Sequence, residues 1–165
     1  MADGADGLSA DPKISARLML ATYVVGAVGL ALSFSTLQHS PPSLSLGCLL
    51  AVGACGVISF FRHAVFNRSD AARMGWDYGR RNNFQIEVGL ANLAWGLAAI
   101  AAVVLGWGIH AEAMTFIVFG FYMLGVTVMQ VFAPEGEGRP LGPMLGLVSY
   151  GVMLTIVGAW GMLAS

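Results

Sequence analysis

The chain has 165 residues, of which 57% are hydrophobic and only 10% are charged. Its mean hydropathy is +0.74. A soluble domain carries about 25% charged residues, and one core of this size cannot enclose so much apolar surface. We therefore interpret the excess as surface that faces lipid. The formal net charge is -1, and the sequence has no basic face with interleaved aromatic residues, which argues against nucleic-acid binding.

Residues 1–16 precede the first apolar run and are mostly small, polar and acidic. The opening segment, MADGADGLSADP, offers few side chains that could join a core. This composition is typical of disorder. We expect residues 1–16 to form a disordered N-terminus and residues 17–165 to form a single domain.

Five apolar runs follow in chain order. We place spans over residues 18–37, 44–65, 84–108, 112–133 and 141–163. Each is close to the roughly 20 residues that a helix needs to cross a bilayer. Each is also continuously apolar rather than alternating like a barrel strand. The sequence thus predicts an all-α fold, a polytopic transmembrane helical bundle of about five spans.

The first run has an alternative interpretation as a signal peptide. Lys13 and Arg17 precede it, and Ala31 and Ser33 form a small-x-small site. The apolar run is longer than the usual signal-peptide core of about 7–15 residues. We therefore expect it to be retained as a helix.

The basic residues all fall on one side of this predicted bundle. They are Lys13, Arg17, Arg62, Arg68, Arg73, Arg80, Arg81 and Arg139. With five spans, these positions occupy the N-terminus and the loops after spans two and four. The positive-inside rule then predicts a cytoplasmic N-terminus and a C-terminus outside.

Small residues recur at four-residue spacing in two spans. They are Gly47, Ala51, Cys55 and Ser59 in the second span, and Ala94, Ala98 and Ala102 in the third. Close helix contact in lipid depends on such side chains. We expect the stripes to form seams between helices, with an oligomer interface as the alternative.

The two cysteines, Cys48 and Cys55, lie in the second span. Seven residues of helix separate them by about 10.5 Å of rise, which is too far for a mutual disulfide. No clustered Cys or His pattern indicates a metal site, and we predict no cofactor.

The loop of residues 66–83, between spans two and three, is the longest non-apolar segment apart from the termini. We expect Ser69 to cap a short helix over residues 70–74, which Gly75 would end in the left-handed conformation. The candidate docking residues are Arg68, Arg73, Trp76, Arg80 and Arg81. The loop is interpreted either as an anchor attracted to anionic lipid or as a cytoplasmic docking face for a partner.

Glu87 is an acidic residue just inside the third span. Asn82 or Asn83 is a suitable N-cap, and the helix dipole favours a negative charge near this end. Arg62 lies at the same predicted depth. We expect a Glu87–Arg62 ion pair between spans two and three. The alternative is a role in a site, because ionisable residues in spans usually face the bundle interior.

Other polar residues indicate where a ligand could bind. Gln85 and Asn92 share one helical face with Gly89 and Gly96, and a deep Asn92 needs a partner. His63 can hydrogen-bond or carry protons near neutral pH. We expect any ligand cavity to lie between spans two and three. Its candidate ligand-binding residues are Glu87, Asn92, His63, Arg62 and Gln85.

Three short motifs carry a family resemblance. They are F-F-R-H from Phe60, A-x-R-x-G-W ending at Trp76, and F-Q-x-E-V-G-x-A-N from Phe84 to Asn92. Together they resemble a group of small uncharacterised bacterial integral membrane proteins that is distantly similar to the DoxX type. The resemblance implies a helical bundle in the bacterial inner membrane and, for DoxX-type members, links to membrane redox complexes and small-molecule pockets.

Two hypotheses of function remain. The first is an accessory or scaffold subunit of a membrane complex that docks through the arginine-rich loop. The alternative is a site within the bundle for a quinone, a lipid or another amphipathic ligand, with a redox or proton-coupled role. The sequence indicates no catalytic residues, so an enzyme is the less favoured reading. The expected partners are membrane lipids and another membrane protein or a second copy of the chain.

Overall fold

The computed structural model describes residues 11–76, 83–132 and 141–164. These residues form helices and turns, with no strand among them. Five helical segments are long and apolar enough to cross a membrane: Pro12–Thr36, Ser45–Val65, Asn83–Val104, Ile109–Phe132 and Met144–Leu163. The prediction of an all-α bundle with five spans is confirmed.

The first helix, α2 (Pro12–Thr36), begins earlier than predicted. Asp11 precedes it, and a side-chain oxygen of Asp11 accepts a hydrogen bond from the Lys13 N–H at 2.9 Å. Pro12 suits the first helical position because its φ is already fixed and the N–H it lacks would have no helical partner there. Residues 12–16 are therefore helical, which corrects the predicted disorder of that stretch; residues 1–10 lie outside the described part.

The second crossing segment consists of four consecutive helical pieces. They are α3 (Ser45–Gly47), η1 (Cys48–Ala54), α4 (Cys55–Phe60) and η2 (Phe61–Val65). The two η pieces are π-helical, a conformation that is rare and occurs frequently at functional sites. The second of them carries Arg62 and His63.

The small-residue stripe of the second segment forms a seam, as predicted. All four of its members, Gly47, Ala51, Cys55 and Ser59, are buried. Part of the seam faces α2, where Gly29 lies against the backbone of Ala51 and Gly47 lies against Ser33. The oligomer alternative does not apply to this stripe, because the chain itself covers it.

The prediction that the stripe of the third span forms a seam within the chain is wrong, and its alternative as an oligomer interface stays a prediction. In α6 (Asn83–Val104), Ala94 and Ala98 are exposed and only Ala102 is buried. The helix instead packs through Gly89, Asn92, Gly96 and Ala99. A Cβ added to Gly56 of α4 would lie 2.5 Å from the Asn92 carbonyl oxygen, so the two helices touch backbone to backbone there.

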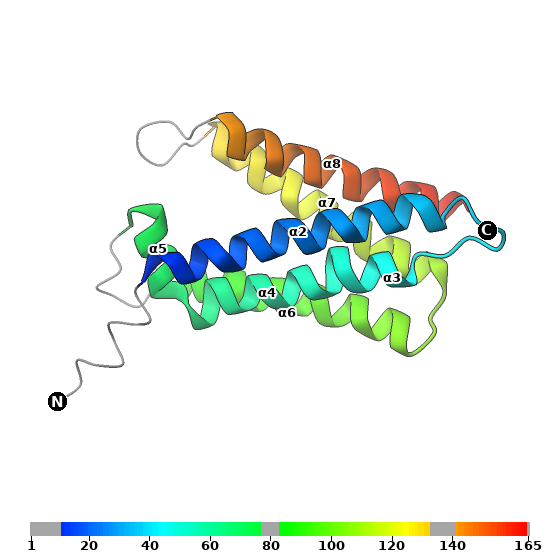
Figure 1. The fold of residues 1–165 in the computed structure, drawn as a ribbon, viewed down its shortest axis with the longest axis horizontal. Coiled ribbons are helices and arrows are strands. Elements are labelled where there is room, and N and C mark those ends of the chain that lie inside the picture. Colours follow the sequence, from blue (N-terminus) through cyan, green and yellow to red (C-terminus); the bar gives the residue numbers. More distant parts are fainter. Residues whose placement is uncertain (1–10, 77–82, 133–140, 165) are drawn as a thin grey trace.

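The last two helices, α7 (Ile109–Phe132) and α8 (Leu141–Leu163), form a hairpin. They pack along much of their length, whereas α6 and α7 meet over a much shorter stretch. Figure 1 shows the hairpin diverging from α2, α4 and α6 toward the end of the bundle at which α5 lies. Tyr150 of α8 links the hairpin to the second crossing segment, because its hydroxyl donates a hydrogen bond to the Ala51 carbonyl at 2.6 Å.

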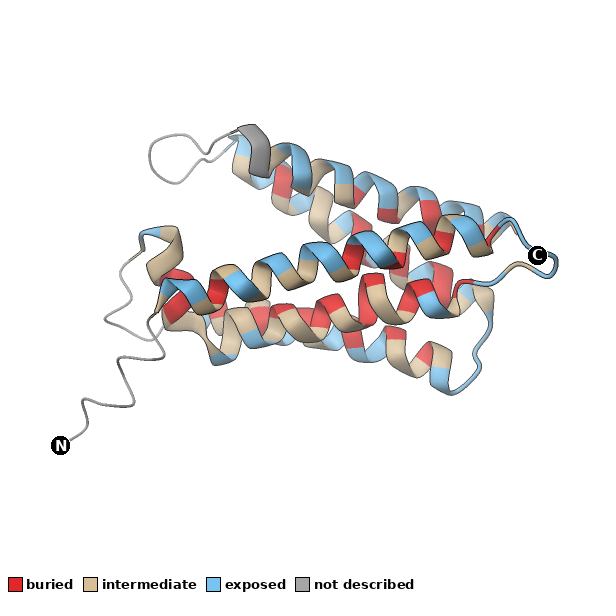
Figure 2. Ribbon diagram, viewed as in Figure 1, coloured by how far each residue is buried: buried red, intermediate tan, exposed pale blue. Residues whose placement is uncertain are grey.

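The outward faces of the long helices are apolar. Figure 2 shows exposed residues along these faces, and they include Leu20, Phe84, Leu97, Phe121 and Leu145. Such a surface suits lipid rather than water. The short helix α5 (Asn67–Met74) lies at the end where α2 and α6 begin. We call this end, which carries Lys13, Arg17, Arg62, Arg68 and Arg73, the basic end.

Candidate functional site

The basic end is organised around the carboxylate of Asp70. Asp70 belongs to α5, and its side chain is only 2% exposed. Gly75, with a φ of 73°, ends the helix in the left-handed conformation as predicted. The predicted cap is wrong, because α5 already begins at Asn67 and Ser69 lies inside it. The earlier start places both Ser69 and Asp70 against the N-terminal end of α2.

Besides His63, three side chains donate hydrogen bonds to Asp70: one from α2, one from α6 and one from α5 itself. The Ser15 hydroxyl of α2 lies 2.5 Å from Oδ1, and Nε2 of Gln85 in α6 lies 3.0 Å from Oδ2. Arg73 reaches Oδ1 from one turn further along α5, with Nη2 at 2.9 Å and Nε at 3.3 Å. The carboxylate thereby joins the ends of three helices that are far apart in sequence.

His63 connects Asp70 to a second arginine. Its Nδ1 lies 2.9 Å from Asp70 Oδ2, and its Nε2 lies 2.5 Å from Nη2 of Arg62. A guanidinium can only donate, so Nε2 must accept and the proton of a neutral imidazole must sit on Nδ1. Arg62 is thus coupled to Asp70 through a neutral His63, and its own Nε lies 3.9 Å from Oδ1.

The environment of Asp70 favours its charged form. Burial alone would raise the pKa of the carboxyl, but the hydrogen bond from His63, the charge of Arg62 and the hydrogen bond from Ser15 outweigh it. The pKa of Asp70 is therefore held well below its usual range. A buried carboxylate with this many donors is a fixed anion rather than a proton carrier near neutral pH.

Ser69 also ties the start of α5 to the start of α2. Its hydroxyl accepts a hydrogen bond from the Ser15 N–H at 2.9 Å and donates one to the Asp11 carbonyl at 2.5 Å. Ser15 Oγ also accepts from Nε of Arg73 at 3.0 Å. We call the set Ser15, Arg62, His63, Asp70, Arg73 and Gln85 the Asp70 cluster.

Glu87 does not join this cluster. It is exposed on α6 and makes no hydrogen bond or ion pair with the described residues, while the carboxylate beside Arg62 is that of Asp70. The predicted Glu87–Arg62 pair is therefore wrong. The physical reason is that α5 folds back against the bundle and brings a nearer carboxylate to Arg62.

Only some of the other predicted site residues lie in the Asp70 cluster. His63, Arg62, Gln85 and Arg73 meet in the cluster. Asn92 is buried deeper in α6; its Nδ2 donates to the Val88 carbonyl at 2.8 Å, and it lies beside the Tyr122 hydroxyl. Arg68 and Trp76 are half-buried at the basic end. Arg80 and Arg81 lie outside the described residues.

Asp70 and Ser15 are functional-site residues that were not predicted from the sequence. Asp70 was placed in the loop helix but was not considered as a partner for the arginines. One local signal was available, because an Asp three residues before an Arg on a helix can form an ion pair. No local pattern indicated Ser15, which lies 55 residues away from Asp70 along the chain.

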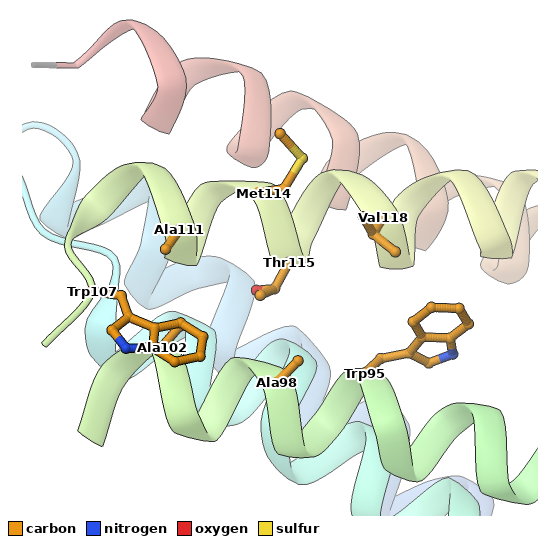
Figure 3. Close-up of a pocket in the computed structure, with 8 residues that line it drawn as sticks. All are labelled: Trp95, Ala98, Ala102, Trp107, Ala111, Met114, Thr115 and Val118. Carbon is orange, nitrogen blue, oxygen red and sulfur yellow. The ribbon is translucent and has the colours of Figure 1, made fainter. Parts of the chain in front are cut away.

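A second feature lies between α6 and α7, toward the end opposite the basic end. It is a cleft of about 300 Å³ lined by Trp95, Ala98, Ala102, Trp107, Ala111, Met114, Thr115 and Val118. Figure 3 shows the two indole rings on the α6 side and in the turn that follows it, facing the small side chains of α7. The lining is almost entirely carbon. The Thr115 hydroxyl is occupied, because it donates to the Glu112 carbonyl at 2.7 Å.

This cleft is not where a ligand cavity was expected. The prediction placed one between spans two and three, but there Gly56 and Gly96 bring α4 and α6 into backbone contact. None of the candidate ligand-binding residues Glu87, Asn92, His63, Arg62 and Gln85 lines the cleft. The hairpin of α7 and α8 contacts α6 over only a short stretch.

Aromatic rings pack against Trp95, which lines the cleft. The ring centroids of Trp95 and Tyr122 are 5.9 Å apart, and Tyr122 stacks on Phe119 at 6.3 Å. Nε1 of Trp95 is buried and has no hydrogen-bond partner among the described residues. A buried indole N–H normally has a partner, so this donor is available to a ligand or a water molecule.

Glu112, the first residue of the fourth predicted span, is a buried acid. It lies in the first turn of α7, is 5% exposed, and accepts a hydrogen bond from the Ser45 hydroxyl at 2.8 Å. The helix dipole favours a negative charge at this position. Within the described ranges no three His, Cys, Asp or Glu residues are grouped to hold a metal ion, and both cysteines are free.

Comparison with known proteins places this architecture in a family. A family model, that of a family of unknown function (DUF6790), matches residues 13–138. The chain belongs to this family. The match takes in α2 to α7, including the Asp70 cluster and both walls of the cleft, and ends before α8. No curated protein and no solved structure matches the chain.

Proposed function

We propose that this small membrane protein binds the hydrocarbon chain of an amphipathic membrane ligand in the cleft between α6 and α7. The observation that carries the proposal is the cleft itself, with its volume of about 300 Å³ and its carbon lining. That volume lies at the lower end of the range for ligand pockets, about 300–1,000 Å³. No lining side chain is charged, so the polar part of the ligand would remain at the rim.

The exposure of the lining supports a ligand that arrives from the bilayer. Trp107 is 59% exposed and Met114 47% exposed, so the cleft opens through the surface that faces lipid. Trp107 also lies in the turn between α6 and α7, and indoles favour the headgroup level. A chain that enters from the adjacent leaflet would place its headgroup near Trp107. We commit to a lipid acyl chain as the ligand; the isoprenoid tail of a quinone shares its chemistry and is distinguished by the test.

The test fills the cleft and measures what co-purifies. Ala98→Phe places a ring in the cleft, and we expect loss of a lipid that the wild-type protein retains through mild-detergent purification, measured by mass spectrometry. Ala94→Phe is the matched control, since Ala94 is exposed one turn away on α6 and does not line the cleft. If the wild type retains a quinone instead of a phospholipid, the ligand is a quinone. If both variants retain the lipid equally, the cleft is not the binding site.

A second candidate, an accessory subunit of a membrane complex, is favoured by Glu87. This carboxylate faces outward from a membrane-crossing helix and has no partner among the described residues. An ionisable group in a span usually finds a partner, so a cation on a neighbouring subunit would suit it. This moves the expected docking surface from the arginine-rich loop to α6, since Arg73 is turned into the Asp70 cluster.

Site-specific crosslinking tests the second candidate. A photoreactive residue at Leu90, which is exposed near Glu87, should crosslink to a defined partner, and Glu87→Gln should reduce that crosslink several-fold. The same reporter at Leu20, exposed on α2, serves as the control. Crosslinks that are unchanged by Glu87→Gln would count against docking through this face. For either function we propose the bacterial inner membrane, with the basic end cytoplasmic, because basic residues concentrate on cytoplasmic loops.

A further inference from the structure

The charges of the Asp70 cluster do not balance. Two guanidinium groups, those of Arg62 and Arg73, approach one carboxylate, that of Asp70. His63 is neutral, because its Nε2 accepts from Arg62 while its Nδ1 donates to Asp70. Ser15 and Gln85 add donors but no charge. Among the described residues the cluster therefore carries one excess positive charge.

This excess charge lies at the ends of membrane-crossing segments, where the apolar core of a bilayer meets its polar headgroups. Arg62 is in the last turn of a membrane-crossing segment, and Gln85 is near the start of the next one. The side chains of Arg62, His63 and Arg73 are 17%, 18% and 22% exposed, so they are half-buried but reachable from outside. Nε of Arg62 is buried and has no hydrogen-bond partner in the described part of the chain.

We propose that Arg62 and Arg73 bind the phosphate group of an anionic membrane lipid at the basic end. An unpaired charge that is partly removed from water is costly, and buried charges are normally paired. Guanidinium groups match phosphate oxygens in geometry as well as in charge. Basic pockets between membrane helices on the cytoplasmic side are suited to anionic headgroups. This site is separate from the α6–α7 cleft and does not depend on the function proposed for it.

The source of the phosphate follows from the position of the cluster. Arg62 and the start of α6 lie at the ends of membrane-crossing helices, which is the level of lipid headgroups. A lipid is present there at high local concentration, whereas free phosphate must come from solution. The exposed Lys13 and Arg17 at the start of α2 add to the attraction of this end for anionic lipid, without belonging to the cluster.

The experiment compares thermal unfolding in nanodiscs of phosphatidylglycerol and of phosphatidylcholine at one ionic strength. A phosphate contact to one arginine near the surface corresponds to a rise in Tm of roughly 2–4 °C in a chain of this size. We expect this rise for the wild-type protein and its loss in Arg62→Gln. That variant leaves Asp70 paired with Arg73, so the cluster becomes neutral and no longer needs an anion.

Arg17→Gln is the matched control, because it removes an exposed arginine from the same end and should keep most of the rise. Arg62→Lys restores the charge and should restore part of it. Inorganic phosphate added to phosphatidylcholine nanodiscs tests the other source of phosphate. If it raises the Tm of the wild type but not of Arg62→Gln, the site holds free phosphate and the assignment to a lipid is wrong. No rise in the wild type, or an equal rise in Arg62→Gln, overturns the proposal.

A second measurement covers the case in which Arg62→Gln fails to fold. Protein extracted from nanodiscs that contain both lipids in equal amounts is analysed by native mass spectrometry. We expect the bound lipid to be enriched in phosphatidylglycerol for the wild type and equally for Arg17→Gln. An unenriched ratio in the wild type, or enrichment that disappears in Arg17→Gln, overturns the assignment to Arg62 and Arg73.

Discussion

The two ends of this bundle are held by different kinds of contact. At the basic end, side chains of α2, η2, α5 and α6 converge on one carboxylate, and at least five polar groups lie within hydrogen-bonding or ion-pair distance of it. Toward the opposite end, α6 and α7 leave an apolar cleft between them. Directional contacts dominate at the basic end, whereas at the other end they are fewer, such as the Ser45–Glu112 hydrogen bond, and apolar side chains line the cleft. A membrane protein gains little from burying apolar surface against its own helices, so an opening between apolar helices costs less there than in water.

This difference implies that the basic end should be the more sensitive to single substitutions. The largest effect is expected for Asp70→Ala, which leaves Arg62 and Arg73 facing each other without an anion. Removing one partner of a buried ion pair costs about 3–5 kcal/mol. We expect a loss of this size in the free energy of unfolding, measured by denaturant titration in mixed micelles.

Glu87→Ala is the control for Asp70→Ala, because Glu87 is an acid at the same end that is exposed and has no described partner. Its expected change is within about 0.5 kcal/mol, as for surface substitutions elsewhere. If both variants lose the same stability, the Asp70 cluster does not organise this end of the bundle.

The backbone seam between α4 and α6 should give a smaller effect. A Cβ at Gly56 would lie 2.5 Å from the Asn92 carbonyl oxygen and 2.8 Å from Cα of Gly96. Gly56→Ala therefore forces the helices apart, with a cost of about 1–3 kcal/mol for overpacking. The same titration measures it.

Gly125→Ala is the matched control for the seam. A Cβ at Gly125 of α7 meets nothing within 4 Å, so the better helix propensity of alanine should leave stability unchanged or raise it by up to about 1 kcal/mol. A Gly56→Ala variant as stable as Gly125→Ala would show that the close approach of α4 and α6 is not required.

The sequence predicted those features that depend on local composition and failed where distant segments meet. Five apolar runs, the stripe from Gly47 to Ser59 and the left-handed Gly75 each follow from a local pattern, and each is found. The sequence also indicates Arg62, His63 and Gln85 as candidate ligand-binding residues. The predicted partner of Arg62 was Glu87 rather than Asp70, because depth along a helix does not reveal which way the helix is turned.

The cleft could not be predicted for a related reason. Its walls are mostly apolar residues of α6, of α7 and of the turn between them, and no local pattern marks them as sides of one cleft. The opening depends on how the hairpin of α7 and α8 lies against the other helices, and contacts such as Tyr150 with Ala51 help to hold it there. These two residues are 99 positions apart in the sequence, and no spacing rule connects them.

The smallest expected effect concerns pH and shows whether the Asp70 cluster behaves as a fixed anion. The pKa of Asp70 in the folded protein lies below its unfolded value of about 3.9. Such a carboxyl contributes stability that is fully present above the unfolded pKa and is lost as pH falls through the folded pKa. The difference in free energy of unfolding between the wild type and Asp70→Asn should therefore stay constant from pH 8 to pH 5 and begin to shrink only below about pH 4.

A difference that already changes between pH 8 and pH 6 would mean that His63 takes up a proton there, since an imidazolium cannot accept the hydrogen bond from Arg62. The neutral tautomer, and the charge count of the cluster that rests on it, would then be wrong.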